Sequence, residues 1–141
     1  MGTRFLKQVV AFAVLTLVFT ACSRESVTTA DLQGTWQSEC VNDAGGHYRT
    51  TVVFSGNSFE LYDSNFTQIN CTGTVSSQTP VTGTYSLSGT LMDWITGSER
   101  SYDMIELSSD KKTLHFGAKA GTTPSTRPTD VANGRPYHKL N

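Results

Sequence analysis

The stretch Tyr48–Asp63, with the sequence YRTTVVFSGNSFELYD, carries the clearest structural signal in the chain. On each side of Gly56-Asn57 the apolar side chains recur at every second position, as they do in an antiparallel strand with one buried face. Glycine and asparagine tolerate the positive φ that tight two-residue hairpin turns require. The stretch therefore predicts a β-hairpin.

Similar short alternating runs extend from this hairpin in both directions, between Gly34 and Gly117, and helical periodicity is not sustained in any of them. The expected strands are 35–41, 48–54, 58–63, 67–75, 81–87, 91–95, 102–107 and 113–116. Regular strand spacing of about 8–12 residues is typical of barrels and sandwiches. We therefore expect an all-β fold, a small antiparallel up-and-down barrel of about eight strands, with a β-sandwich as the alternative.

The size and charge of the chain narrow the class of protein. Its 141 residues suit one globular domain. The formal charge is −1 and the charged residues are scattered singly, so no basic field is available to bind nucleic acid. A nucleic-acid partner is not expected.

Residues 1–21 have the layout of a secretory signal peptide. Arg4 and Lys7 precede the apolar run Val9–Phe19, which is too short to cross a bilayer. The residues that follow, Phe19-Thr20-Ala21-Cys22, resemble the lipobox of bacterial lipoproteins. The resemblance implies that the Cys22 thiol is alkylated by diacylglycerol and that Cys22 becomes the first residue after cleavage.

The lipoprotein resemblance also implies a location in the cell. Ser23, not Asp, follows the cysteine, which in a Gram-negative source favours the periplasmic face of the outer membrane. The membrane partner would then be held through acyl chains on Cys22, with residues 22–30 forming the lipidated cysteine and its tether. Removal of residues 1–21 takes away two of the 11 basic residues and leaves all 12 acidic ones, so the exported chain is mildly acidic.

Two cysteines remain, Cys40 and Cys71, an even number in a chain expected in an oxidising compartment. A disulfide between them is the default prediction. It would close a loop of about 32 residues and add about 3–4 kcal/mol to the stability. A zinc pair or a catalytic thiol is disfavoured, because neither CxxC spacing nor nearby histidine ligands accompany these cysteines.

The segment Leu32-Gln33-Gly34-Thr35-Trp36 resembles the Gly-x-Trp signature that opens the first strand of lipocalins. The resemblance implies that Gly34 and Trp36 are structural and that Trp36 closes one barrel end beneath a basic residue, for which Arg100 is the candidate. The barrel domain is expected over 31–117. Residues 118–141 are expected to form a Pro/Gly/Thr-rich C-terminal tail, with 136–140 returning as an edge strand or covering the barrel mouth as the alternative.

No catalytic motif or metal-ligand spacing is present, so neither an enzyme nor a cofactor is expected. Candidate contacts to a ligand or partner are His47, Tyr48, Trp94 and Tyr102. Two hypotheses follow for this envelope lipoprotein. In one, the domain is an interaction module that contacts an envelope protein through its surface; in the other, the barrel binds or carries a small apolar ligand or lipid.

Overall fold

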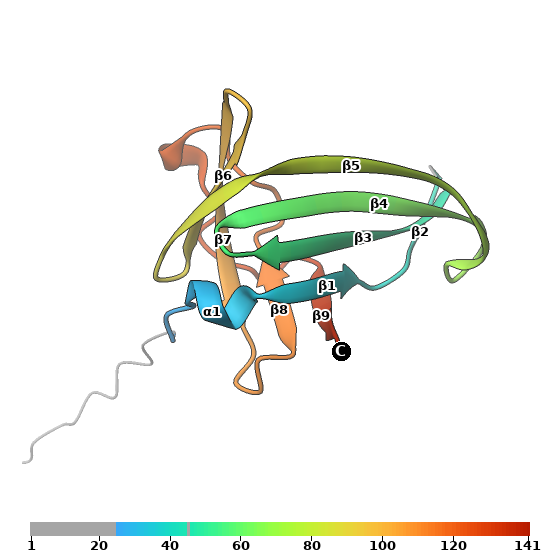
Figure 1. The fold of residues 1–141 in the computed structure, drawn as a ribbon, viewed down its shortest axis with the longest axis horizontal. Coiled ribbons are helices and arrows are strands. Elements are labelled where there is room, and N and C mark those ends of the chain that lie inside the picture. Colours follow the sequence, from blue (N-terminus) through green and yellow to red (C-terminus); the bar gives the residue numbers. More distant parts are fainter. Residues whose placement is uncertain (1–24, 45) are drawn as a thin grey trace, which may run out of the picture.

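The computed structural model describes residues 25–44 and 46–141, apart from the side chains of 76–79, and is nearly all β (Figure 1). Its helices are α1 (Thr29–Leu32) and the short 3-10 helix η1 (Pro124–Thr126). Its strands are β1 (Gly34–Ser38), β2 (Val41–Asp43), β3 (Gly46–Ser55), β4 (Ser58–Gln68), β5 (Thr72–Ser88), β6 (Leu91–Thr96), β7 (Glu99–Leu107), β8 (Thr113–Phe116) and β9 (Pro136–Leu140).

Eight of these strands close into an antiparallel barrel. Strands β3 to β9 pair in chain order, and β1 pairs with both β9 and β3, which completes the ring. Strand β2 is an addition that pairs only with the start of β3. The expected up-and-down barrel is therefore confirmed.

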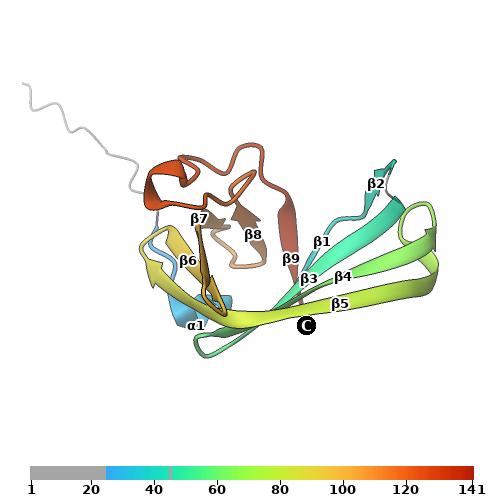
Figure 2. The same cartoon turned by 90° about the horizontal axis from the view of Figure 1, so that it is seen from above.

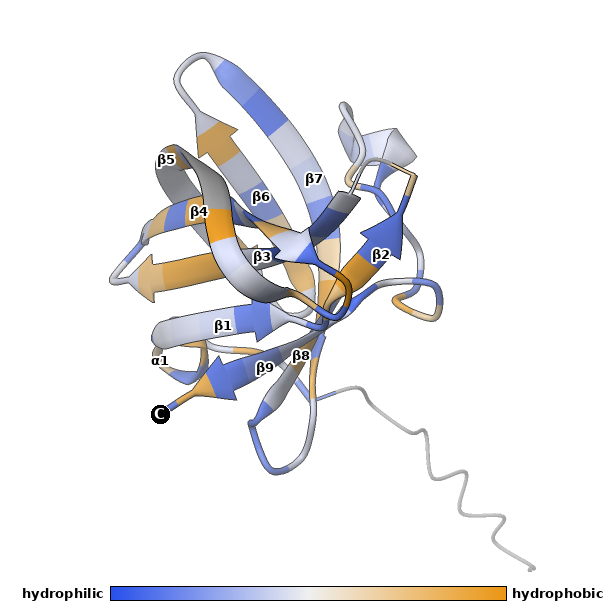
Figure 3. Cartoon of the chain, turned by 90° about the vertical axis from the view of Figure 1, so that its right-hand side faces the viewer, coloured by the Kyte–Doolittle hydropathy of each residue, from blue (hydrophilic) through white to orange (hydrophobic). Residues whose placement is uncertain are grey.

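The central hairpin forms as its sequence predicts, with β3 and β4 joined at Gly56-Asn57. Hydrophilic and hydrophobic positions follow one another along the strands (Figure 3). This alternation directs one side of each strand into the barrel. Val52, Phe54 and Phe59 are among the residues buried there.

The strands differ from the expected list in several places: the expected strand 35–41 divides into β1 and β2, and β4 extends beyond the expected end at 63. The expected strand 67–75 contains the β4–β5 turn, where Asn70 and Cys71 have φ of 64° and 54°, and the chain then continues as one long strand through Pro80. Strand β6 pairs with β5 only over 84–88, and the Tyr85 N–H donates toward β4, to the carbonyl of Asn57. Backbone N–H groups alternate between the two edges of a strand, so the Pro80 nitrogen points to the edge of β5 on which β6 pairs. Strand β6 does not extend as far as Pro80, so the absent N–H removes no hydrogen bond between strands.

The eighth barrel strand is β9, in the segment 118–141 that was expected to form a tail; residues 136–140 return to the sheet, as in the alternative prediction. It pairs with β1 over Tyr137–Leu140 and with β8 over Pro136–His138. The barrel strands therefore run from Gly34 to Leu140.

One end of the barrel, which we call the closed end, is filled by apolar side chains. Residues with no solvent exposure there and in the adjoining core are Leu32, Trp36, Val52, Met92, Ile105 and Leu114. The Trp36 Nε1 donates to the Leu32 carbonyl at 2.6 Å, so α1 and β1 close this end together.

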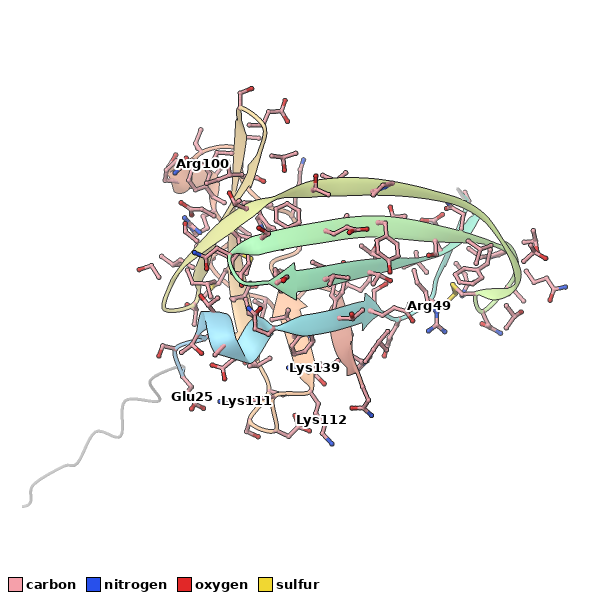
Figure 4. All side chains as sticks on the ribbon, in the orientation of Figure 1. Glu25, Arg49, Arg100, Lys111, Lys112 and Lys139 are labelled. Atoms are coloured by element: carbon pink, nitrogen blue, oxygen red, sulfur yellow. A yellow bond between two sulfur atoms is a disulfide. The ribbon has the colours of Figure 1, made fainter. Side chains whose placement is uncertain are left out.

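The basic residue over Trp36 is Lys139, not Arg100. The Lys139 Nζ lies 5.1 Å from the Trp36 ring centroid. Arg100 is exposed on β7, 3.9 Å from the Asp93 carboxylate, and lies far from Lys139 in Figure 4. The expectation for Arg100 was wrong because the barrel domain was expected to end at 117, whereas β9 carries Lys139 to the closed end.

The opposite end, which we call the open end, is flared. Strands β3, β4 and β5 run away from β6, β7 and β8 toward β2 (Figure 2). The predicted disulfide is confirmed here: Cys40 and Cys71, with a Cα–Cα distance of 5.6 Å, join the β1–β2 connection to the β4–β5 turn. The disulfide thus ties the far end of the β4–β5 hairpin to the end of β1, on the side of the flare that β3, β4 and β5 form.

Candidate binding site at the open end of the barrel

A layer of aromatic rings separates the filled core from the open end. Trp94 on β6 is its centre, with ring centroids 4.7 Å from Phe59, 5.5 Å from Phe116 and 5.8 Å from Phe54. Phe116 also meets Tyr137 edge to face at 5.1 Å. Because these rings come from five strands, the layer spans the barrel and forms a floor.

Above this floor lies an open apolar hollow of about 220 Å³ between β4–β5 and β6–β7. Its lining is Phe59, Leu61, Val81, Trp94, Thr96, Ser101 and Ala120. Val81 keeps 39% of its surface exposed. The volume is below the range of about 300–1,000 Å³ that is usual for small-molecule pockets, so it suits a single side chain or a small chemical group.

The side of the open end formed by β3, β4 and β9 is polar. The Thr50 hydroxyl donates to the Asp63 carboxylate at 2.6 Å and is also a hydrogen-bond partner of the Tyr137 hydroxyl. Burial raises the pKa of Tyr137 above its ordinary value. The Arg135 guanidinium lies 5.5 Å from the Tyr48 ring centroid.

Arg135 and Tyr137 also line a second hollow, of about 310 Å³, with Phe116, Gly117, Ala118 and Asn133. Phe116 and Tyr137 thus serve both as floor and as lining. The open end therefore offers an apolar recess beside a polar one, over a shared aromatic floor.

Asp103 lies beneath the segment that follows β8. It is 6% exposed, and its Oδ1 accepts from the backbone N–H groups of Met104 at 2.8 Å and Gly117 at 3.0 Å. Burial raises the pKa of this carboxyl, although the two backbone hydrogen bonds oppose the shift. Its hydrogen bonds tie β7 to the start of the 117–135 segment.

The same segment is fixed from its far side by Arg127. The Arg127 Nη1 donates to the carbonyls of Met92 at 2.8 Å and Asp103 at 2.6 Å, and Nη2 donates to the Asp93 carboxylate. Its guanidinium also lies 5.2 Å from the Tyr102 ring centroid. These contacts hold the segment that carries Ala120 against β6 and β7, which completes the lining of the apolar hollow.

The structure brings together only some of the predicted contact residues. Trp94 forms the floor and Tyr48 lies at the polar side of the open end. Tyr102 alternates with Ser101 on β7 and so faces away from the hollow that Ser101 lines. His47 is on β3 with its Nδ1 3.0 Å from the Asn42 side-chain oxygen. No sequence motif marks Arg127 or Asp103 as part of this framework.

The predicted signal peptide 1–21 and Cys22 lie outside the described residues. In the part of the chain that is described, no helix is both long and apolar enough to cross a bilayer. Nor does that part contain a group of three or more His, Cys, Asp or Glu side chains that could hold a metal ion. No protein-family model, curated protein or solved structure with which the chain was compared matches it.

Proposed function

We propose that this chain is a lipid-anchored lipoprotein of the bacterial cell envelope whose barrel binds a partner through its surface at the open end. The observation that carries the proposal is the contrast between a filled core and an open apolar recess. Trp36, Met92, Ile105 and Leu114 have no exposed surface, so side chains occupy the centre of the barrel. Leu61, Val81 and Trp94 line an open hollow instead.

The chemistry of the hollow supports a protein partner. A recess of about 220 Å³ accommodates one apolar side chain, and its neighbouring hydroxyl and guanidinium groups can hydrogen-bond a backbone. Aromatic residues and arginine are enriched where protein surfaces bind one another. The expected partner is therefore an envelope protein that inserts an apolar side chain over Trp94.

The anchor is proposed from the lipobox resemblance at Cys22. Two or three acyl chains, at about 0.8 kcal/mol per buried methylene, hold a protein at a membrane far more firmly than one chain does. Replacing Cys22 with Ser tests this directly. We expect the unmodified chain in the membrane fraction with the mass of an acylated product, and C22S without acyl mass and without membrane attachment.

A second candidate function is the binding of a small apolar ligand, which the apolar floor of the hollow favours. Native mass spectrometry of the domain produced from Ser23 onward in an oxidising compartment separates the two candidates. A bound small molecule appears as extra mass that is lost on denaturation. The protein-partner proposal expects the bare mass of the disulfide-closed domain.

The partner proposal is tested with a photoreactive amino acid at Val81, and the matched control is Leu91. Both side chains have similar exposure, 39% and 40%, but Leu91 lies at the β5–β6 turn of the closed end. We expect a discrete protein adduct from position 81 in intact cells and none from 91. Thr96→Arg, which fills the hollow from an exposed position, should abolish that adduct; equal adducts at both positions would refute the proposal.

A further inference from the structure

The chain joins the barrel at the closed end, very soon after Cys22. Val27 is 6% exposed and its N–H donates to the Gly89 carbonyl in the β5–β6 turn at 3.3 Å. Helix α1 begins two residues later, and Leu32 at its end is completely buried. The free tether is therefore shorter than the expected 22–30, because the chain is packed against the barrel from Val27 onward.

Helix α1 is also locked in place by charged and polar contacts. Asp31 pairs with Lys111 of the β7–β8 turn at 2.6 Å, and the Lys139 Nζ donates to the Asp31 carbonyl at 3.4 Å. Thr28 and Asp31 form a reciprocal capping box. The hydrogen bond from Lys111 lowers the pKa of Asp31 to about 2, so the pair stays charged at neutral pH.

The reach of the tether can be compared with the size of the barrel. From Cys22 to Val27 there are five Cα–Cα steps, which span at most about 18 Å. Strand β5 alone contains 17 residues between the closed end and the open end, a contour of about 55 Å. An anchor at Cys22 thus holds the closed end near the bilayer. When the barrel axis stands perpendicular to the membrane, the tether is too short to bring the open end to the bilayer.

The charges around the tether do not change this conclusion. Lys111, Lys112 and Lys139 lie with Glu25 at the end where the described chain begins (Figure 4), and Asp31 lies between Lys111 and Lys139. Basic and acidic groups are therefore mixed on this surface. The length of the tether, not attraction to anionic lipids, sets the distance to the membrane.

We propose that the closed end of the barrel faces the bilayer that holds Cys22 and that the open end points away from it. This inference rests on the proposed lipid anchor. It means that the membrane surface lies next to α1 and the three turns of the closed end, β3–β4, β5–β6 and β7–β8. It also means that the apolar hollow is presented to a water-exposed protein and not to lipids of the anchoring bilayer.

The test measures the distance of each end from the membrane. A small fluorescent amino acid is placed singly at Asn57, Ser109 or Ile69 of the full chain. The first two lie in closed-end turns, and Ile69, 62% exposed, lies in the β4–β5 turn of the open end. The purified lipoprotein is reconstituted in phosphatidylethanolamine–phosphatidylglycerol vesicles that carry a nitroxide on some headgroups. We expect quenching at 57 and 109 to be several-fold stronger than at 69, and insensitive to salt.

Two matched variants establish the cause. In C22S, quenching should be weak at all three positions. A Gly/Ser insert of twenty residues after Ser23 adds about 70 Å of reach, so the difference between the two ends should largely disappear. Quenching that is equal at both ends of the original chain, or strongest at Ile69, overturns the proposed orientation.

The mass and membrane fractionation of the same samples separate the two proposals. A chain without acyl mass refutes the anchor and, with it, the orientation. An acylated chain quenched most strongly at Ile69 refutes the orientation alone.

Discussion

The two ends of this barrel are stabilised by different means. At the closed end, Leu32 and Trp36 are completely buried and α1, β1 and β9 converge on them. At the open end, Ile69 and Val81 are 62% and 39% exposed, and the Cys40–Cys71 disulfide ties the turn that carries Ile69 to the end of β1. Noncovalent burial secures one end and a covalent bond secures the other.

The comparison explains how a small domain can expose apolar surface without losing its fold. Burial stabilises a protein by about 25 cal/mol for each Å² of apolar surface removed from water, and the closed end supplies much of this. The disulfide acts on the unfolded chain, so it stabilises the whole domain without filling the open end. The hollow over Trp94 can therefore stay open.

The largest effect is expected from Trp36→Ala. Loss of a fully buried tryptophan side chain leaves a cavity and typically costs about 3–5 kcal/mol. Urea unfolding of the domain should show a drop of this size. Ile69→Ala at the open end should change the free energy of unfolding by no more than about 0.5 kcal/mol. Similar losses for both variants would remove the contrast between the ends.

The next largest effect is expected from the double variant Cys40→Ser, Cys71→Ser. The cysteines are 31 positions apart, and freeing such a loop should lower the free energy of unfolding by about 3–4 kcal/mol. Hydrogen exchange should accelerate most in β2 and in the adjoining parts of β3, β4 and β5.

Chemical reduction of the unmodified domain is the control for the cysteine variant, and it should reproduce the same local pattern. Backbone amides of β1 and β9 near Trp36 exchange when the whole domain unfolds, so their protection should fall by no more than the ~3–4 kcal/mol lost from the free energy of unfolding. If β2 and the adjoining strands lose no more protection than these amides, the disulfide stabilises the whole barrel evenly and not the open end in particular.

Local sequence signals were sufficient for the parts of the fold that depend on neighbours in the chain. The alternation on both sides of Gly56-Asn57 predicted the β3–β4 hairpin, and the Cys40–Cys71 pair followed from cysteine count and compartment. Strand β9 has only five residues and begins with Pro136. Its pairing with β1 and β8 depends on contacts with distant strands, which local patterns do not encode.

The candidate site likewise contains residues that the sequence identifies and residues that only the fold brings to it. Trp94 and Tyr48 could be named as contacts because aromatic side chains are enriched where proteins bind one another, although both are half-buried here. Arg127 lies in a Pro- and Thr-rich segment with no motif around it, and its role depends on backbone carbonyls of β6 and β7. The continuity of β5 through Pro80 likewise depends on where β6 ends.

The smallest expected effect is on the pH dependence of the free energy of unfolding, and it comes from Asp103, which lies between the core and the open end. Burial raises the pKa of its carboxyl, so the folded domain keeps this proton at pH values where the unfolded chain has released it. The contribution of the group to stability is complete below the ordinary carboxyl pKa and is lost as the pH rises through the raised value. In Asp103→Asn this dependence is absent, while the amide oxygen can still accept from Met104 and Gly117.

We therefore expect the stability of the unmodified domain, relative to D103N, to increase as the pH falls from 7 to 4 in urea unfolding. Asp110→Asn is the control of opposite sign. The hydrogen bond from Ser108 lowers the pKa of the exposed Asp110 carboxyl, so the unmodified domain should lose stability relative to D110N as the pH falls below about 5. If the D103N difference is flat or falls toward acid pH, hydrogen bonding and not burial controls this carboxyl. In that case the Asp103 carboxylate is charged beneath the aromatic floor at neutral pH, and its charge does not lower the free energy of unfolding.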